Sequence, residues 1–198
     1  MENDESHKSL FAKCVGMLLE PVPANLNAEM AEELYSNARE KTLGANSEQD
    51  FIDSHKLIER VLELEGISIE LRGLALIFSA MNYIDGRGVK ADPQRALKNL
   101  IECDKIGHEE GAFNLGLFFE GRFGKIYPIS KDFNLAAFFY SRSIRMGSVY
   151  AITNLGLLHV GGYLSVSNKD LGWYLLRYAE MKGDIVATEA ICKLSKRF

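Results

Sequence analysis

The sequence predicts an all-α fold, a solenoid of antiparallel helix pairs. The main observation is a repeated segment: GHEEGAFNLG at 107–116 returns as GSVYAITNLG at 147–156, with glycine and Asn-Leu-Gly in the same frame. Self-similarity with a period of about 20–50 residues indicates a repeat architecture, in which each unit packs on its neighbours. Apolar residues at helical spacing on both sides of Gly-rich breaks indicate that each unit is a pair of helices.

Small residues define the repeat frame. They begin four matching segments at Ala75, Gly111, Ala151 and Ala187, which are separated by 36, 40 and 36 residues. The longer step reflects an insertion in the loop of the second repeat, within GRFGKIYPIS at 121–130. The sequence therefore predicts a basic period of 36 residues.

The second helix of each repeat has recognisable ends. A side chain that can accept hydrogen bonds from first-turn amides precedes it, and these capping residues are Asp92, Asp132 and Asn168. A glycine that suits the left-handed conformation follows it, and these glycines are Gly107, Gly147 and Gly183. Each repeat is therefore expected to hold two helices, with a tight turn leading into the next repeat.

The chain is expected to divide into three parts. Residues 1–70 are predicted to form degenerate helices that cap the array, with helical periodicity at about 26–43 and 48–65. Residues 71–183 hold three repeats. Residues 184–198 form a C-terminal capping helix, because a terminal unit must present a polar outer face.

The repeats resemble the Sel-one-like repeat family, which is related to the tetratricopeptide repeat. The matching segments are AITNLG (151–156), AFNLG (112–116), YIDGRGVKAD (83–92) and RAL (95–97). Ser79-Ala80 in place of Leu-Gly, and His159 in place of an aromatic residue, depart from the family pattern.

The resemblance implies a right-handed α-α superhelix that mediates protein–protein interaction without catalysis, as a scaffold or adaptor. Two alternatives remain open from the sequence. One is an immunity protein that neutralises a cognate bacterial toxin, and the other is an enzyme with an unrecognised site.

Composition and charge argue against several classes of protein. A net charge of -4 is unfavourable for a nucleic-acid binder that neutralises phosphates. No segment has the roughly eighteen consecutive apolar residues of a membrane span. The apolar residues between Leu10 and Leu19 have the spacing of an amphipathic helix and not of a signal-peptide core. We therefore expect a cytoplasmic location.

No motif identifies a catalytic, metal or cofactor site. GRGVKA follows a predicted helix instead of a strand, so a phosphate loop is not indicated. His159 is expected to pack at the core or its rim, and His108 to be solvated or to cap a helix. Three cysteines are expected to be buried and reduced: Cys14, Cys103 and Cys192. We expect no cofactor and no catalytic residue.

The expected binding surface is the concave groove, since tetratricopeptide relatives bind partners along the first helix of each pair. Its predicted partner is another protein or peptide, and a homodimer through the same groove is a further hypothesis. The competing interpretation is that this stripe forms core. The predicted groove residues are Ile77, Met81, Ile84, Asp85, Phe113, Leu117, Glu120, Tyr150, Thr153, Leu157 and Val160. The inserted loop is a second candidate, through Arg122, Phe123, Lys125, Ile126 and Tyr127.

Overall fold

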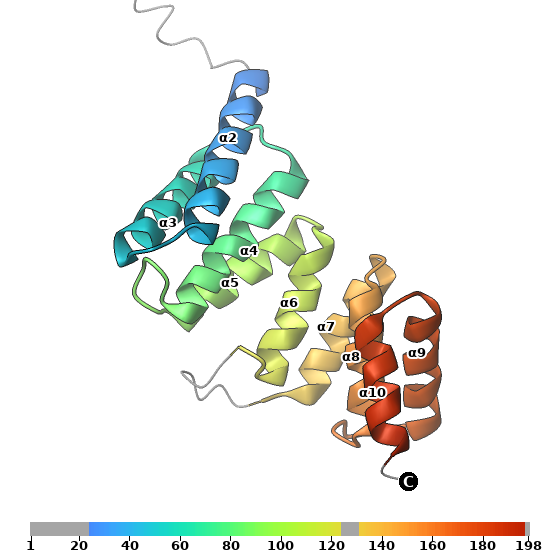
Figure 1. Ribbon diagram of the computed structural model, residues 1–198. Helices are drawn as coiled ribbons and strands as arrows, with labels where there is room; N and C mark the ends of the chain where they lie inside the picture. The colour runs from blue at the N-terminus through green and yellow to red at the C-terminus, as the bar shows by residue number, and fades with distance from the viewer. Residues whose placement is uncertain (1–23, 124–130, 197–198) are drawn as a thin grey trace, which may run out of the picture.

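The computed structural model describes residues 24–123 and 131–196, with side chains from residue 27 onward. Within these residues the chain forms nine α-helices and no β-strand. The helices follow one another as antiparallel pairs along an arc (Figure 1). The predicted all-α fold of paired helices is confirmed.

The N-terminal pair is α2 (Ala24–Leu43) and α3 (Glu48–Glu63), close to the two predicted helical segments. Three repeat pairs and a single last helix follow. Their bounds are α4 (Ile69–Asp85) with α5 (Pro93–Lys105), α6 (Glu109–Glu120) with α7 (Phe133–Arg145), α8 (Val149–Val160) with α9 (Lys169–Met181), and α10 (Ile185–Ser195). The first repeat helix thus begins slightly before the predicted domain boundary at residue 71.

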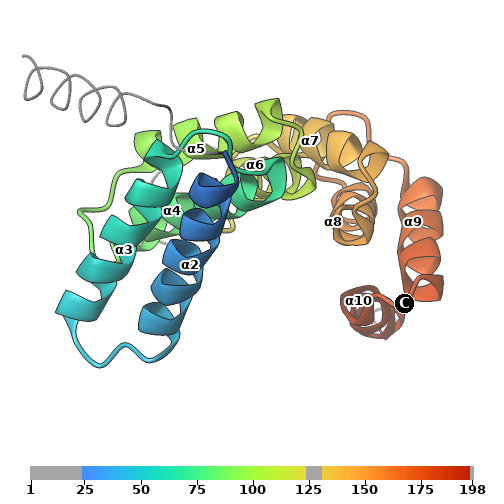
Figure 2. The same cartoon turned by 90° about the horizontal axis from the view of Figure 1, so that it is seen from above.

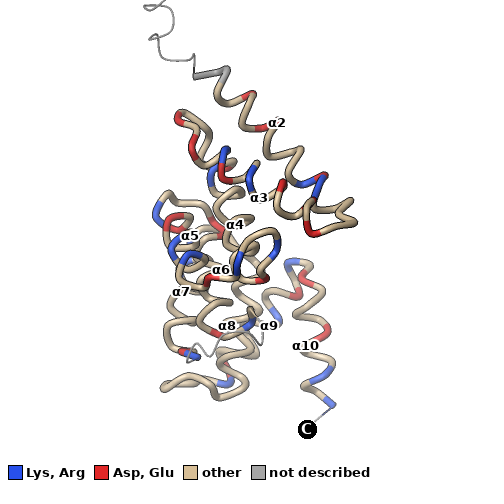
Figure 3. Tube along the Cα trace, turned by 90° about the vertical axis from the view of Figure 1, so that its left-hand side faces the viewer, with Lys and Arg blue, Asp and Glu red and all other residues tan. Residues whose placement is uncertain are grey.

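The first helices of the pairs lie on the inner side of the arc and the second helices on its outer side (Figure 2). Each helix packs on the next one in the chain, and α4 also contacts α6, as α8 contacts α10. Acidic and basic residues are intermixed along the chain (Figure 3). The inner side is therefore formed by α2, α4, α6, α8 and α10.

The predicted helix ends are confirmed. The Asp92 carboxylate accepts hydrogen bonds from the amides of Gln94 and Arg95 at 3.0 and 3.1 Å. Asp132 and Asn168 accept from first-turn amides in the same way, at 2.9 and 3.0 Å. The glycines that close the second helices all have positive φ: Gly107 (84°), Gly147 (107°) and Gly183 (88°). These local contacts produce the alternation of loops and tight turns.

Small residues are required where the two helices of a repeat cross. A Cβ atom on Gly116 would lie only 2.5 Å from Cδ1 of the buried Tyr140 ring. A Cβ atom on Gly172 would lie 2.8 Å from the carbonyl oxygen of Gly156. In the first repeat the matching crossing is made by Ala80 beside Leu100, within one buried cluster. The small residues at these crossings therefore set the distance between the two helices of each repeat.

Candidate partner-binding surface

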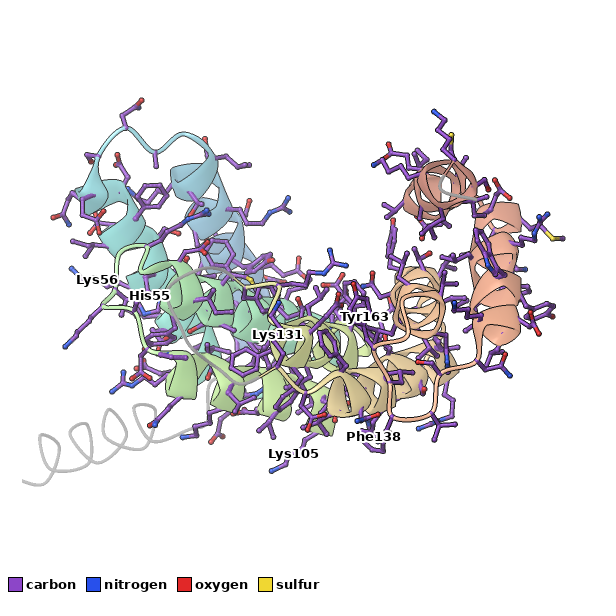
Figure 4. All side chains as sticks on the ribbon, turned by 90° about the horizontal axis from the view of Figure 1, so that it is seen from below. His55, Lys56, Lys105, Lys131, Phe138 and Tyr163 are labelled. Atoms are coloured by element: carbon purple, nitrogen blue, oxygen red, sulfur yellow. The ribbon has the colours of Figure 1, made fainter. Side chains whose placement is uncertain are left out.

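A cavity of ≈ 570 Å³ lies on the inner side of the arc, and we call it the concave cavity. It extends across α4, α6 and α8 to the turn before α10, and Figure 4 shows the side chains from below. All three repeats therefore contribute to one surface. The lining residues are Ile77, Met81, Glu109, Glu110, Phe113, Asn114, Gly147, Ser148, Val149, Tyr150, Lys182, Gly183 and Asp184.

The apolar part of the concave cavity contains two partly accessible aromatic rings. Phe113 is half-buried, and its ring centroid lies 6.0 Å from that of Tyr140 and 6.4 Å from that of Tyr150. Tyr140 is fully buried, whereas Tyr150 is 64% exposed. Phe113 thus packs on the buried Tyr140 ring, whereas the Tyr150 ring is accessible to a ligand. Such a ring can pack against an apolar group or receive a cation on its face.

The rim of the concave cavity is acidic. Glu109 and Glu110 are exposed at the start of α6. The buried Asp184 carboxylate accepts hydrogen bonds from the Thr153 hydroxyl and the Val186 amide. Lys182 is the single cation in the lining, and its ammonium lies 5.6 Å from the centre of the Tyr178 ring. Three carboxylates against one ammonium favour a cationic ligand.

The helix N-termini at the concave cavity do not reverse its preference for a cationic ligand. A free helix N-terminus attracts anions through its unpaired amides. At α8 the Ser148 hydroxyl accepts from the Ala151 amide at 3.4 Å, and at α10 Asp184 caps the first turn. Glu109 and Glu110 place negative charge beside the first turn of α6. Side chains of the protein thus offset the partial positive charge at all three helix N-termini.

Four of the predicted groove residues line the concave cavity: Ile77, Met81, Phe113 and Tyr150. Two others are inaccessible, and the structure corrects the prediction for them. Ile84 is only 5% exposed because the core cluster around Leu100 and Leu115 covers it. Thr153 is 1% exposed because it is turned toward α10, where it bonds to Asp184.

The remaining predicted groove residues lie outside the concave cavity. Leu117 packs against the cluster around Tyr140 and Leu158. Glu120 accepts hydrogen bonds from the Tyr140 hydroxyl at 2.6 Å and from Arg122 at 2.8 Å.

Asp85, Val160 and Leu157 lie farther along the inner helices. Asp85 is exposed and pairs with Arg87 at 3.1 Å. Val160 packs close to Gly172 of α9. Leu157 lines a separate depression of ≈ 280 Å³ between α8 and α10.

The inserted loop is only partly within the described residues. Arg122 is exposed and bonded to Glu120, whereas Phe123 is partly buried against the cluster of α4, α5 and α6. Phe123 therefore anchors the start of the loop. The predicted contacts of Lys125, Ile126 and Tyr127 lie outside the described residues.

Sequence reasoning missed the acidic rim. Glu109 and Glu110 begin α6, and Lys182 and Asp184 flank the turn into α10. The repeat spacing could have indicated these charged residues, because Gly107, Gly147 and Gly183 predict turns at the same position of successive repeats. Those turns lie at one end of the inner helices, which brings the first residues of three helices to the same edge.

Two expectations about single residues are wrong. His108 stands at the N-cap position of α6, but it neither caps the helix nor reaches solvent. Its ring packs on Gly73, and its Nε2 lies 3.3 Å from a carboxylate oxygen of Glu70. Cys192 is exposed instead of buried, whereas Cys103 is buried as predicted. Cys14 lies outside the described residues.

His159 lies at the rim of the core, beside the α8–α9 loop. Its Nδ1 accepts a hydrogen bond from the Asn168 amide at 3.2 Å, and partial burial lowers its pKa. Among the described residues, no group of three or more His, Cys, Asp and Glu side chains is placed to hold a metal ion. None of the helices within 24–123 and 131–196 combines the length and hydropathy needed to cross a membrane.

Solved structures with the same architecture exist. A Sel1 repeat protein from Oxalobacter formigenes superposes with a TM-score of 0.65 at 20% identity, covering 82% of this chain and 62% of that one. A protective antigen of uropathogenic Escherichia coli strains, which displays an SLR fold, matches with a TM-score of 0.50 at 18% identity. That match covers 84% of this chain and 42% of the antigen.

The chain thus spans less than two thirds of the length of either structural relative. No protein-family model matches the sequence, and no curated protein matches it. The shared architecture therefore rests on the three-dimensional comparison together with the repeat spacing. The chain has the Sel1-like repeat fold, as the sequence resemblance predicted.

Proposed function

We propose that this helical repeat protein is an interaction module that binds a peptide segment of a partner protein in the concave cavity. An apolar side chain of the peptide packs against Phe113 and Ile77. A neighbouring lysine or arginine lies at Glu109 and Glu110 and contacts the face of Tyr150. This arrangement makes the protein an adaptor that recognises an apolar-basic motif.

One observation carries the proposal: residues from three successive repeats form a single apolar surface with an acidic rim. Ile77, Phe113 and Tyr150 belong to three different inner helices and line the same cavity. A volume of ≈ 570 Å³ can hold one large side chain and the backbone beside it. The half-buried Phe113 ring in this concave lining suits an anchor site for an apolar side chain of the partner.

The charge of the rim determines the peptide class. Glu109 and Glu110 are exposed, so they attract a cation without a large desolvation cost. Lys182 offsets this little, because its ammonium is directed toward Tyr178 on the outer side. An acidic peptide would therefore be repelled. Binding should weaken as salt increases, since rim charges are screened over about 8 Å at physiological ionic strength.

The experiment is selection from a random peptide library displayed on phage, with the purified chain immobilised. We expect enriched sequences to place an aromatic or large aliphatic residue next to lysine or arginine. For the best peptide, Tyr150→Ala should weaken binding at least tenfold, and Glu110→Lys should do the same. Both residues are exposed, so both variants should keep the helical circular dichroism spectrum of the parent chain.

Tyr174→Ala is the matched control, because Tyr174 is 65% exposed, almost the same fraction as Tyr150, but lies on α9 at the outer side. It should leave the peptide affinity unchanged. The proposal is wrong if the enriched peptides are acidic, or if Tyr174→Ala weakens binding as much as Tyr150→Ala.

A further inference from the structure

The N-terminal part of the chain carries the combination of side chains that the concave cavity favours. Residues 8–13 read KSLFAK, and we call them the N-terminal motif. Its two large apolar residues, Leu10 and Phe11, each lie two residues from a lysine. The motif itself lies outside the described residues. Apolar side chains flanked by cations complement an apolar lining with an acidic rim, so the chain contains a ligand of the class proposed for the cavity.

The described chain begins at the edge of the arc that carries the acidic rim. Asn27, in the first turn of α2, donates a hydrogen bond to the carbonyl oxygen of Glu65 at 3.1 Å, just before α4. Glu70, in the first turn of α4, has a carboxylate oxygen 3.3 Å from Nε2 of His108, the residue before Glu109. The helices α2, α4 and α6 all begin toward the top of Figure 1. The N-terminal motif therefore joins the described chain at the edge where the rim lies.

The connection between the motif and α2 is long enough to reach the concave cavity. Phe11 precedes Ala24 by 13 residues, and an extended chain of that length spans up to about 43 Å. Packed helices lie about 8–10 Å apart, so the step from α2 across α4 to α6 needs roughly 20 Å. The connection from Glu65 to Glu70, which follows the helix starts, adds at most about 17 Å. Phe11 can therefore reach the lining between Ile77 and Phe113.

We propose that the N-terminal motif binds in the concave cavity of its own chain and thereby competes with a partner peptide. Leu10 and Phe11 pack against Phe113 and Ile77, and the two lysines lie at the exposed carboxylates beside them. The identity of the competitor rests on the proposed function, whereas the contact within the chain requires no partner. The cavity is then available to a partner only when the motif leaves it.

The order of charges along the segment matches the order of charges along the cavity. A chain that leaves α2 passes α4 and α6 before it reaches the turn into α10. The two lysines of the motif come first and meet the exposed carboxylates of Glu70, Glu109 and Glu110. The acidic residues within 2–5 come last and lie toward Lys182, the single cation in the lining. The opposite direction would place these acidic residues at the acidic rim.

Tethering sets the expected size of the competition. A short flexible linker gives an effective concentration on the order of 1 mM. A motif that binds with a dissociation constant of about 100 µM then occupies the cavity about ten times as often as it leaves it empty. The apparent affinity of a partner peptide falls by the same factor.

Photo-crosslinking within the full chain tests the contact without any partner. We expect Phe11→p-benzoylphenylalanine to form crosslinks within one chain to Ile77, Met81 or Phe113, which peptide mass mapping identifies. The protein is irradiated at about 1 µM, where weak self-association is negligible. The control carries the same photoreactive residue at Leu43, which is 83% exposed at the opposite end of α2. It should form no crosslink to the cavity.

Reversing the rim charges tests the electrostatic part of the proposal. Glu109→Lys/Glu110→Lys should lower the crosslink yield from position 11 about fivefold, and adding Lys8→Glu/Lys13→Glu should restore it. A yield at position 11 no higher than that at position 43 overturns the proposal. Crosslinks that join two chains, or that are confined to 169–181, overturn it as well.

The competition itself is measured with the peptide selected from the library. Leu10→Asp/Phe11→Asp should tighten its binding about tenfold, because the motif no longer occupies the cavity. An unchanged affinity overturns the competition and leaves the proposed function intact. Crosslinks to the cavity in a chain that selects no peptide would support the contact of the motif and contradict the proposed function.

Discussion

The crossing of α6 and α7 yields a quantitative prediction for Gly116→Ala. The new methyl group would lie 2.5 Å from Cδ1 of Tyr140 and 3.0 Å from its Cζ. Tyr140 has no room to withdraw, because it is fully buried and its hydroxyl donates to Glu120 at 2.6 Å. The two helices must therefore separate, or the ring must leave its preferred rotamer.

Two terms of opposite sign determine the change in the free energy of unfolding. Replacing glycine by alanine inside a helix gains about 1 kcal/mol. Overpacking of a tight core costs about 1–3 kcal/mol, and a separation this short belongs at the upper end. The expected net loss is about 2 kcal/mol. A loss of that size is a large fraction of the stability of a small protein.

The first repeat supplies the compensating change. Its matching residues are Ala80 and Leu100, which pack in one buried cluster. Gly116→Ala/Tyr140→Leu recreates this pair in the second repeat. The methyl group should then fit, so in the Tyr140→Leu background the overpacking cost of about 3 kcal/mol should disappear and the helix-propensity gain of about 1 kcal/mol should remain. The expected coupling of about 3 kcal/mol lies at the upper end for residues in contact.

Urea denaturation followed by far-ultraviolet circular dichroism measures all four forms: the parent, the two single variants and the double variant. A coupling energy of about 3 kcal/mol supports this account of the packing. If the effects of the two substitutions are additive within about 0.5 kcal/mol, the Tyr140 ring does not limit the approach of α6 to α7, which contradicts this prediction.

Three further predictions concern side-chain chemistry and helix ends. Burial raises the pKa of Cys103 to about 12, so in the native chain at pH 8 a thiol reagent should label the exposed Cys192 and leave Cys103 unmodified, as peptide mass mapping will show. Burial lowers the pKa of His55 in the folded chain. As the pH falls below about 6.5, His55 is therefore protonated in the unfolded chain before it is protonated in the folded chain. The free energy of unfolding should therefore fall between pH 7 and 5.5, and His55→Gln should lose less over that interval. Asp132→Ala removes the cap of α7 and should cost about 1 kcal/mol in urea denaturation, with an unchanged value counting against the cap.

The fold could be predicted from the sequence because its determinants are local. A capping side chain such as Asp92 acts on amides two and three residues away, and a glycine such as Gly107 fixes a turn through its own φ. These signals recur with the repeat, so each occurrence supports the others. The helix pairs follow from them.

The binding surface could be predicted only in part, because the repeat frame identifies a helix but not how deeply each of its side chains is buried. Ile77 and Ile84 both belong to α4, yet Ile77 is accessible and Ile84 is covered by the α5 and α6 contacts. His108 shows the same limit. Its counterparts Ser148 and Asp184 cap their helices, whereas its larger ring packs on Gly73.

The central claim is that the concave cavity is the binding surface. Hydrogen exchange followed by mass spectrometry, with and without the peptide selected from the library, tests it most directly. We predict that the peptide slows exchange in the segments 109–117 and 148–155, which form the inner edge, and leaves 169–181 unchanged. Protection confined to 169–181 would place the peptide on the outer face of α9 and contradict the claim.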